Sequence, residues 1–435
     1  MRDALKQYDS DFSRLKAIPQ PLWLQKIRQA AFRRFGELGF PTTDQEAWRF
    51  TNVEPIALTP FQSAPPYHPN GLTPEKLDPL TCWSFGSPRL VFVDGQFAPE
   101  LSSLKELING LVISPLSTAL STHGPLLERH LNQYVSSEHP FVALNSSFLT
   151  EGAFIHLSPG VHFEKPIQII CYSKKSDHRT VTHPRHLIVL EERAHATVVE
   201  TYLGKGHYFT NAVTEVFSGE NSFLDHYKLQ REGREAFHVG LLQSYQERGG
   251  CFVSHSLSLG GLLTRNEINA LLAREGAECV LDGLYVADQQ QQIDNQTCID
   301  HAEPHGTSGE LYKGILKGNS KAVFNGRIVV RANAQKTRAK QSNKNLLLSD
   351  DAQINTRPLL EIHADDVKCN HGATVGRLDE NQVFYLKSRG ISEPLARGLL
   401  TTAFANEIVD RIKINPLKAF LNHYLMEHLE QQADV

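Results

Sequence analysis

Short β-type runs recur between residues 150 and 376, and the segments between them show no helical periodicity. The runs are rich in Val, Ile, Leu, Phe and Thr and are separated by Gly, Asn, Asp and Glu. Seven of them begin at residues 197, 223, 252, 280, 323, 354 and 369, which gives intervals of 26, 29, 28, 43, 31 and 15 residues. A unit of this size without a helix hides its apolar face only by stacking on its neighbours.

This repeat predicts a mainly β fold, a parallel β-helix in which each coil of strands stacks on the previous one. The intervals of 43 and 15 residues fit if they are about one and a half and one half of a unit. A β-sandwich or a jelly roll stays open as an alternative on the pattern alone. At 435 residues the chain is long enough for such a core and for further domains.

Four regions are expected along the chain, and each has its own sequence texture. They are an N-terminal helical region and linker (1–80), a mixed α/β segment that leads into the core (81–150), the parallel β-helix core (151–378) and a C-terminal helical domain (379–435). Within the first, apolar residues at helical spacing predict a helix that starts near Leu22 and stops at Gly39. The Pro-rich stretch 58–79 predicts an extended linker, and Asp94-Gly95 predicts a hairpin over 89–99.

The C-terminal region predicts two amphipathic helices, at 392–412 and 416–431. In the first, Ser392 suits the N-cap and Pro394 the first turn. Its apolar stripe is Leu395, Leu399, Leu400, Ala403, Phe404, Ile408, Val409 and Ile412. A helical pair at the end of a β-helix either caps the open stack or docks a partner, and the pattern leaves both open.

Composition excludes several classes of partner and location. The net charge of −4 and pI near 6.6 offer no electrostatic attraction for nucleic acid or an anionic membrane. No apolar run approaches the roughly 18 residues of a spanning helix. The N-terminus "MRDALKQYDSDF" is too polar and acidic for a signal or transit peptide, so a cytoplasmic location is expected. The six cysteines, Cys82, Cys171, Cys251, Cys279, Cys298 and Cys369, lack paired spacing, which predicts reduced thiols.

The segment "DVKCNHGATVG" (366–376) places a cysteine and a histidine two residues apart, with a glycine next to the histidine. In the aligned repeats, Cys369 occupies an apolar slot, so a buried cysteine is the default interpretation. His371 points to the same face of the strand, where its counterparts are mostly polar. Two such side chains are too few to hold a metal tightly, and a site here needs ligands from elsewhere, for instance another chain.

Other chemistry has weaker support in the sequence. No G-x-x-x-x-G-K-[ST] motif is present, so ATP binding through a P-loop is not expected. Asp225 and Asp282 share a slot of the repeat, which keeps a carbohydrate-active β-helix enzyme as one alternative. A homo-oligomeric structural solenoid is a third possibility. The polar run 287–296 and the basic run 335–345 are interpreted as solvated loops.

The stretch "DVKCNHGATVGRLDENQVFYLKSRGI" (366–391) resembles the C-terminal signature of the SufB/SufD family, subunits of the Suf iron–sulfur cluster assembly machinery. The likeness extends over most of the chain. It includes "GFPTTDQEAWRFTN" (39–52), "LVFVDGQFAPELS" (90–102), "ALNSSFLTEGAFIHLSPG" (143–160), "HGTSGELYKGILKGNSKAVFNGRIVV" (305–330) and "NKNLLLSDDAQINTRPLLEIHADDVKC" (343–369). The SufB branch carries an "EHEATTS"-like stretch where this chain has "CNHGATVG", which favours the other branch.

The resemblance implies a right-handed parallel β-helix flanked by helical regions, in a non-enzymatic scaffold subunit that pairs with SufB and with the ATPase SufC. It places His371, beside Cys369, at the SufB interface as a transient ligand of a nascent iron–sulfur cluster. It assigns SufC binding to the C-terminal helices, with Leu395, Leu399, Phe404 and Ile408 as the expected contacts. No tightly bound cofactor is implied, and ATP enters only through SufC. A reduced flavin in the complex and a homodimer of the isolated chain both stay open.

Overall fold

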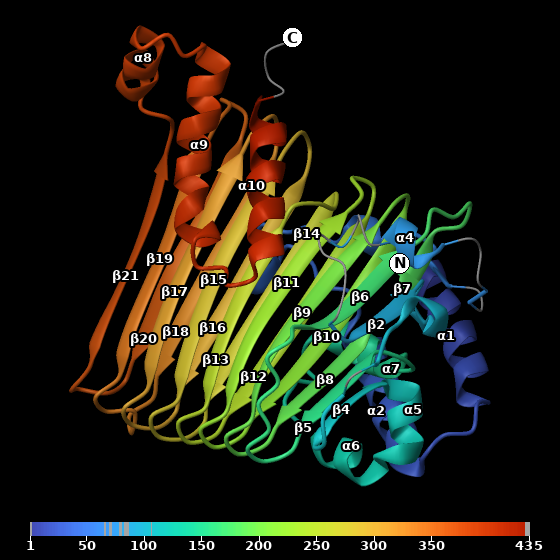
Figure 1. Ribbon diagram of the computed structural model, residues 1–435. Helices are drawn as coiled ribbons and strands as arrows, with labels where there is room; N and C mark the ends of the chain where they lie inside the picture. The colour runs from blue at the N-terminus through green and yellow to red at the C-terminus, as the bar shows by residue number, and fades with distance from the viewer. Residues whose placement is uncertain are drawn as a thin grey trace.

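The computed structural model describes residues 2–430 apart from 65–66, 69–71, 78–80, 82–86 and 106. Cys82 and parts of the predicted 58–79 linker therefore lie outside the described residues. The described chain forms a long two-sheeted β-helix with helices packed against its first coils and a separate helical group near its last coils (Figure 1).

Two sheets make up the β-helix, and successive strands of the chain alternate between them. The first sheet contains β4 (Leu111–Pro115), β5 (Ala153–Leu157), β8 (Arg185–Leu190), β10 (Tyr208–Ser218), β12 (Phe237–Gln246), β14 (Leu263–Leu272), β16 (Gln292–His301), β18 (Lys321–Val330) and β20 (Gln353–Ile362), with β1 (Gln62–Ser63) and β7 (Thr180–Thr182) alongside. The second contains β2 (Arg89–Val93), β3 (Gln96–Phe97), β6 (Ile167–Ser173), β9 (His195–Gly204), β11 (Phe223–Glu232), β13 (Cys251–Ser258), β15 (Glu278–Ala287), β17 (Thr307–Leu316), β19 (Arg338–Leu347) and β21 (Lys368–Gly376).

The predicted parallel β-helix is confirmed, and the β-sandwich and jelly-roll alternatives are excluded. From β6 and β8 onward, neighbouring strands within each sheet pair in parallel, whereas a sandwich or a jelly roll pairs its strands antiparallel. Strands of the second sheet begin at 195, 223, 251, 278, 307, 338 and 368, so one coil takes 27 to 31 residues. The irregular intervals in the sequence arose because the runs at 323 and 354 belong to the first sheet.

Two details of the predicted register are wrong for the same reason. Cys369 pairs with Ala339, which aligns through successive strands with Ser308, Cys279 and Phe252 rather than with residues of β18 and β20. Asp225 and Asp282 do not share a slot, because Asp225 aligns with Val280, two residues before Asp282. A one-sheet alignment cannot separate two interleaved sets of strands with nearly equal spacing.

Two segments interpreted as loops are largely strands. Residues 292–296 of the polar run begin β16, and residues 338–345 of the basic run lie in β19. Their polar side chains alternate with buried ones, as in any strand with one face on a core. Only the turns of the coils, such as 288–291, remain as loops.

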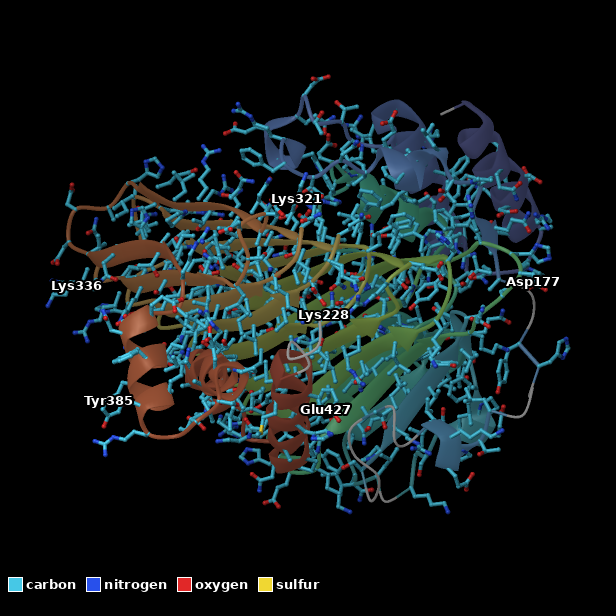
Figure 2. All side chains as sticks on the ribbon, turned by 90° about the horizontal axis from the view of Figure 1, so that it is seen from above. Asp177, Lys228, Lys321, Lys336, Tyr385 and Glu427 are labelled. Carbon is cyan, nitrogen blue, oxygen red and sulfur yellow. The ribbon has the colours of Figure 1, made fainter. Side chains whose placement is uncertain are left out.

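The interior of the β-helix changes character along each coil. One end holds an apolar core to which Leu224, Phe252 and Ile268 contribute. Further along β11 the inward side chains are polar and buried. His226 Nε2 lies 3.2 Å from Glu200 Oε1, and the Lys228 ammonium, near the middle of the molecule in Figure 2, donates to His238 at 3.0 Å. Such a network stabilises one register because each buried group depends on its partner.

Glycines make room for tyrosine rings across neighbouring coils. In the parallel pair of β15 and β17, Gly283 lies beside Tyr312 and Gly314 beside Tyr285. A Cβ atom on Gly283 would sit 2.2 Å from two carbon atoms of the Tyr312 ring. Since both rings are almost completely buried, neither can turn away into solvent.

The N-terminal helices cover the outer face of the first coils. They include α1 (Arg2–Lys16), α2 (Leu22–Leu38), α3 (Glu54–Leu58), α4 (Pro74–Leu77), α5 (Leu116–Thr122), α6 (Gly124–His130) and α7 (Pro140–Ser147), with 3-10 turns η1 (Glu46–Trp48) and η3 (Pro99–Leu101). The helix predicted to end at Gly39 is α2, and the predicted hairpin is β2–β3, with positive φ at Asp94 and Gly95. The linker prediction is wrong in part, since α4 and β1 lie within it.

Three helices follow the last strand: α8 (Glu380–Ser388), α9 (Glu393–Val409) and α10 (Asn415–Glu430). The sequence predicted α9 and α10 and missed α8. The pair α9–α10 packs on the outer face of the second sheet through an apolar cluster. Figure 1 shows α8 and the start of α9 projecting past the ends of the strands.

We expect the variant Gly283→Ala to lower the free energy of unfolding by about 1–3 kcal/mol, because the added methyl group overlaps the enclosed Tyr312 ring. Urea titration followed by circular dichroism measures this. Gly309→Ala in β17 is the matched control, since its Cβ would meet nothing within 4 Å. Equal stability of the two variants would contradict the proposed fit between glycine and ring.

Candidate functional site

Cys369 and His371 lie on β21, the last strand of the second sheet. They pair with Ala339 and Gln341 of β19, which are buried, so both point toward the interior side of the coil. Within the described chain, no further coil follows β20 and β21. The two side chains therefore sit where the interior of the β-helix opens at its end (Figure 1).

The last coil is exposed where earlier coils are buried. In β21, Cys369 is half-buried and every other residue is exposed, whereas inward residues of β19 such as Gln341 and Asn343 are enclosed. Burial raises the pKa of the Cys369 thiol, against the opposing effect of a backbone hydrogen bond at Ala339. The thiol is thus mainly protonated at neutral pH and becomes a ligand only when a cation or base stabilises the thiolate.

His371 continues a line of polar side chains that runs out of the interior. Glu310, Gln341 and His371 align across β17, β19 and β21, and Gln341 Nε2 donates to Glu310 at 2.6 Å. Burial raises the pKa of Glu310 to about 7, despite hydrogen bonds from Thr297 and Gln341. The exposed imidazole of His371 is therefore the end of an internal polar row, placed where a second molecule can reach it.

No complete metal site is present in the described residues, where no group of three or more His, Cys, Asp or Glu side chains could hold an ion. Histidine nitrogen and cysteine sulfur are nevertheless suitable ligands for iron in a cluster precursor. Cys369 and His371 are thus part of a ligand set, and the remaining ligands have to come from outside this coil.

The four expected contact residues of the C-terminal helices have two different environments. Leu395 and Leu399 are 38% and 41% exposed, while Ile408 is fully buried against the sheet. Phe404 is partly buried and lies under the Lys313 ammonium at 4.4 Å from its ring centre. Only the first two are available to a partner while α9 stays packed on the sheet.

Two further apolar residues join the exposed pair at the tip of the helical group. Phe384 and Tyr385 of α8 are 72% and 57% exposed, and Figure 2 shows Tyr385 at the periphery of the molecule. Sequence reasoning missed both because α8 was not predicted, although adjacent aromatics in the polar stretch "RLDENQVFYLKSRG" were a readable signal. We call Phe384, Tyr385, Leu395 and Leu399 the tip surface.

The carboxylates of the enzyme alternative are enclosed. Asp225 and Asp282 are 3% and 2% exposed and lie beneath the loop between α9 and α10. Arg411 of that loop donates to Asp282 at 2.7 Å, and the Lys413 ammonium lies 3.6 Å from Asp225. Neither carboxylate faces a cleft in which a sugar chain could bind, so the residues that favoured a carbohydrate-active enzyme do not form such a site.

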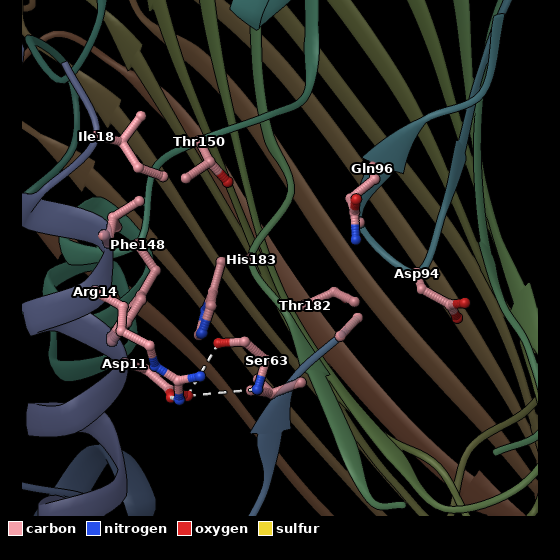
Figure 3. A pocket seen from close by; sticks show the side chains of 14 residues that line it. Asp11, Arg14, Ile18, Ser63, Asp94, Gln96, Phe148, Thr150, Thr182 and His183 are labelled. Atoms are coloured by element: carbon pink, nitrogen blue, oxygen red, sulfur yellow. Dashed lines mark hydrogen bonds and ion pairs between the residues drawn. The ribbon is translucent and has the colours of Figure 1, made fainter. Parts of the chain in front are cut away.

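The first coils carry a separate cavity of about 510 Å³ between α1 and the β-helix. Figure 3 shows Asp11, Arg14 and Ser63 joined by hydrogen bonds at its rim, with His183 pointing toward them. Burial lowers the pKa of His183 to about 3, so the ring is neutral, and its Nδ1 accepts from Asn211. This cavity lies at the opposite end of the molecule from His371 (Figure 1).

The family models match nearly the whole chain. Residues 172–404 match the SufBD core domain of the SUF system for iron–sulfur cluster assembly, and residues 5–169 match the SufBD N-terminal region. The chain therefore belongs to the SufBD family of iron–sulfur cluster assembly proteins. The part of it that the structure describes contains no helix long and apolar enough to cross a membrane.

Individual relatives narrow this class. A SufBD family protein of Synechocystis is 31% identical over 91% of this chain and 88% of the relative. The Escherichia coli iron–sulfur cluster assembly protein SufD is 32% identical over 87% of each chain, and Bacillus subtilis SufD is 26% identical over 92% of each. The chain is a SufD-type member of the family, as the resemblance in the sequence implied.

The reactivity of Cys369 toward iodoacetamide tests its environment in the isolated chain. Because burial raises the pKa of its thiol, we expect alkylation to stay slow at pH 7 and to rise with a midpoint above pH 9. Mass spectrometry of the Cys369 peptide across pH 6–11 measures this, with a free cysteine peptide as the control. A midpoint below that of the control would show that a nearby positive charge stabilises the thiolate.

Proposed function

We propose that this chain is the scaffold subunit of an iron–sulfur cluster assembly complex, joined to SufB by its last coil and to the ATPase SufC by its C-terminal helices. The open last coil is the observation that carries the proposal. A β-helix of this length ends in two edge strands, β20 and β21, whose outer backbone groups have no neighbouring strand in the described chain. Uncovered edges of this kind pair with another chain unless they are protected.

A partner with the same type of core fits this end better than an unrelated surface. The two edge strands are parallel to the rest of their sheets and present a regular row of donors and acceptors. A second β-helix offers the matching row on both sheets at once. Val375 and Ile362, 48% and 40% exposed at the ends of these strands, add apolar area for such a contact.

The proposed cluster site is the seam between the two cores. His371 and Cys369 supply an imidazole and a thiol at the seam, and SufB supplies the rest. A ligand set divided between two subunits holds a nascent cluster while they are together and releases it when they separate. The cluster is cargo, so no cofactor stays bound to this chain. Binding of a reduced flavin by the assembled complex is a further possibility that the same complex would test.

The tip surface is the proposed site for SufC. Its four apolar side chains project from α8 and α9 beyond the sheet, where an isolated chain would gain nothing from exposing them. This chain has no P-loop sequence, so ATP is bound and hydrolysed by SufC alone and this subunit is non-catalytic. Reduced cysteines and this chemistry fit a cytoplasmic complex that involves neither nucleic acid nor membrane.

A second copy of this chain is the competing occupant of the open coil when SufB is absent. The same edge strands would then pair between two identical cores. Size-exclusion chromatography with light scattering distinguishes the cases: we expect a homodimer or monomer alone and conversion to a mixed complex when SufB and SufC are added. A self-assembly that persists unchanged with both partners would favour the structural solenoid instead.

His371→Ala is expected to preserve co-purification with SufB and SufC while lowering cluster formation in cells by about tenfold or more, since one ligand of the shared site is lost. Activity of an iron–sulfur reporter enzyme in a strain that depends on this chain measures the effect. His363→Ala is the control, because His363 is an exposed histidine of the same coil outside β21. Full activity of the His371 variant would remove this residue from the site.

Leu399→Asp is expected to abolish co-purification of SufC while SufB is retained, because a charge in the middle of the tip surface has to be desolvated on binding. Affinity purification of the tagged complex measures both partners in one experiment. Leu58→Asp, at a 55% exposed leucine of α3, controls for a general effect of surface charge. Retention of SufC by the Leu399 variant would place its docking surface elsewhere.

A further inference from the structure

The loop between α9 and α10, residues 410–414, crosses three strands of the second sheet. Below it, one ionisable side chain projects outward from each strand: Asp225 from β11, His255 from β13 and Asp282 from β15. His255 Nε2 lies 3.7 Å from Asp225 Oδ1, and its Nδ1 lies 3.6 Å from Asp282 Oδ2. The three side chains thus form a buried row across neighbouring coils.

The loop supplies the positive charge that this row lacks. Arg411 donates to Asp282 at 2.7 Å, and Lys413 reaches Asp225 at 3.6 Å. The backbone N–H of Lys413 also donates to the hydroxyl of Tyr227, which donates in turn to Asp225 at 3.0 Å. Each carboxylate therefore has its own cation, and both cations come from one short loop.

The histidine in the middle does not provide that charge. Burial lowers the pKa of His255 to about 3, and the nearby Lys413 lowers it further, so the ring is neutral. Burial also raises the pKa of Asp282 to about 6, against the opposing charge of Arg411. Without the loop, the two strands would hold enclosed carboxyl groups with no cation beside them, an arrangement that is costly in a protein interior. The position of the loop and the charge state of the strands are therefore coupled.

The C-terminal half of α9 is fixed to the sheet by further contacts, while its first half is not. Lys313 of β17 and Lys344 of β19 both pair with Glu407, at 2.5 Å and 3.0 Å, and Lys313 donates to the Phe404 carbonyl at 2.7 Å. Ile408 is fully buried in the same contact. By contrast, Leu395 and Leu399 near the start of α9 are exposed. One helix thus joins a free tip surface to a base held by β11, β13, β15, β17 and β19.

We propose that Arg411 and Lys413 are positioning residues that fix the base of the C-terminal helices to β11 and β15, so that a movement imposed on the tip surface is transmitted to the coils that carry β21. This inference rests on the proposed function, in which the partner that moves the tip is an ATPase. A rigid helix transmits displacement only if its base cannot slide over the sheet. The parallel hydrogen bonds from β15 through β17 and β19 to β21 then carry the displacement to the open coil.

The test uses the complete complex with SufB and SufC and the double variant Arg411→Met/Lys413→Met, which keeps side-chain length and removes both charges. We expect SufC to co-purify as with the unmodified chain, since the tip surface is intact. We expect cluster formation in cells to fall by about fivefold or more, and backbone amides of 405–414 to exchange hydrogen at least about tenfold faster. Arg411→Lys should restore a large part of both, because a cation again faces Asp282.

Lys418→Met is the matched control, because it removes an exposed ion pair with Asp410 in the same helical pair without touching the buried row. Equal exchange and equal cluster formation in the double variant and the unmodified chain would overturn the inference. Loss of SufC from the double variant alone would also overturn it, since the loop would then shape the docking surface. If the double variant does not fold, the single variant Lys413→Met, whose side chain is 65% exposed, carries the same test with a smaller effect.

The two levels of the hypothesis fail in different ways. If the unmodified chain does not retain SufC, the proposed function fails before the loop is tested. If the unmodified chain retains SufC and forms clusters, and the loop variants behave identically, only the transmission through Arg411 and Lys413 is wrong.

Discussion

The parallel stacking of coils is the constraint on which the rest of this structure depends. A coil of 27 to 31 residues cannot bury its own apolar face, so each coil is stable only against the next one. At the first coils the N-terminal helices and two antiparallel hairpins cover the stack. At the last coil nothing in the described chain does so, and the residues that would be interior are exposed. The open end that suits a partner thus follows from the way the fold is built.

The interior shows what such stacking requires of individual side chains. Tyrosine rings fill the space left by glycines on the adjacent coil, and charged groups such as Lys228 and Glu200 occur in pairs or networks rather than singly. These arrangements tolerate only one register, because a shift by one residue would bring rings onto Cβ atoms and charges onto apolar groups. A rigid stack results, and rigidity allows a displacement at one coil to reach another several strands away.

The helical group and the open coil lie at the same end of the molecule (Figure 1). The tip surface faces outward there, the base of α9 is attached to the strands just before β21, and His371 is on β21 itself. A SufD-type protein built in this way can place a nucleotide-driven partner and a cluster-assembly seam on one continuous structure. The non-catalytic chain contributes geometry, and the chemistry takes place at its borders with other subunits.

The sequence by itself determined the β-helix, α2, the hairpin at 89–99, the pair α9–α10 and the family, because short-range spacing of apolar residues and turn residues encodes them. It also singled out Cys369 and His371, and the structure places them together on the exposed last coil, although their role remains a prediction. Only the tertiary structure decided that strands alternate between two sheets, which corrected the alignment of Cys369 and separated Asp225 from Asp282. It also decided that these carboxylates face Arg411 and Lys413. Contacts between residues more than a hundred positions apart depend on how coils and helices pack in space, and no local pattern in the chain records that.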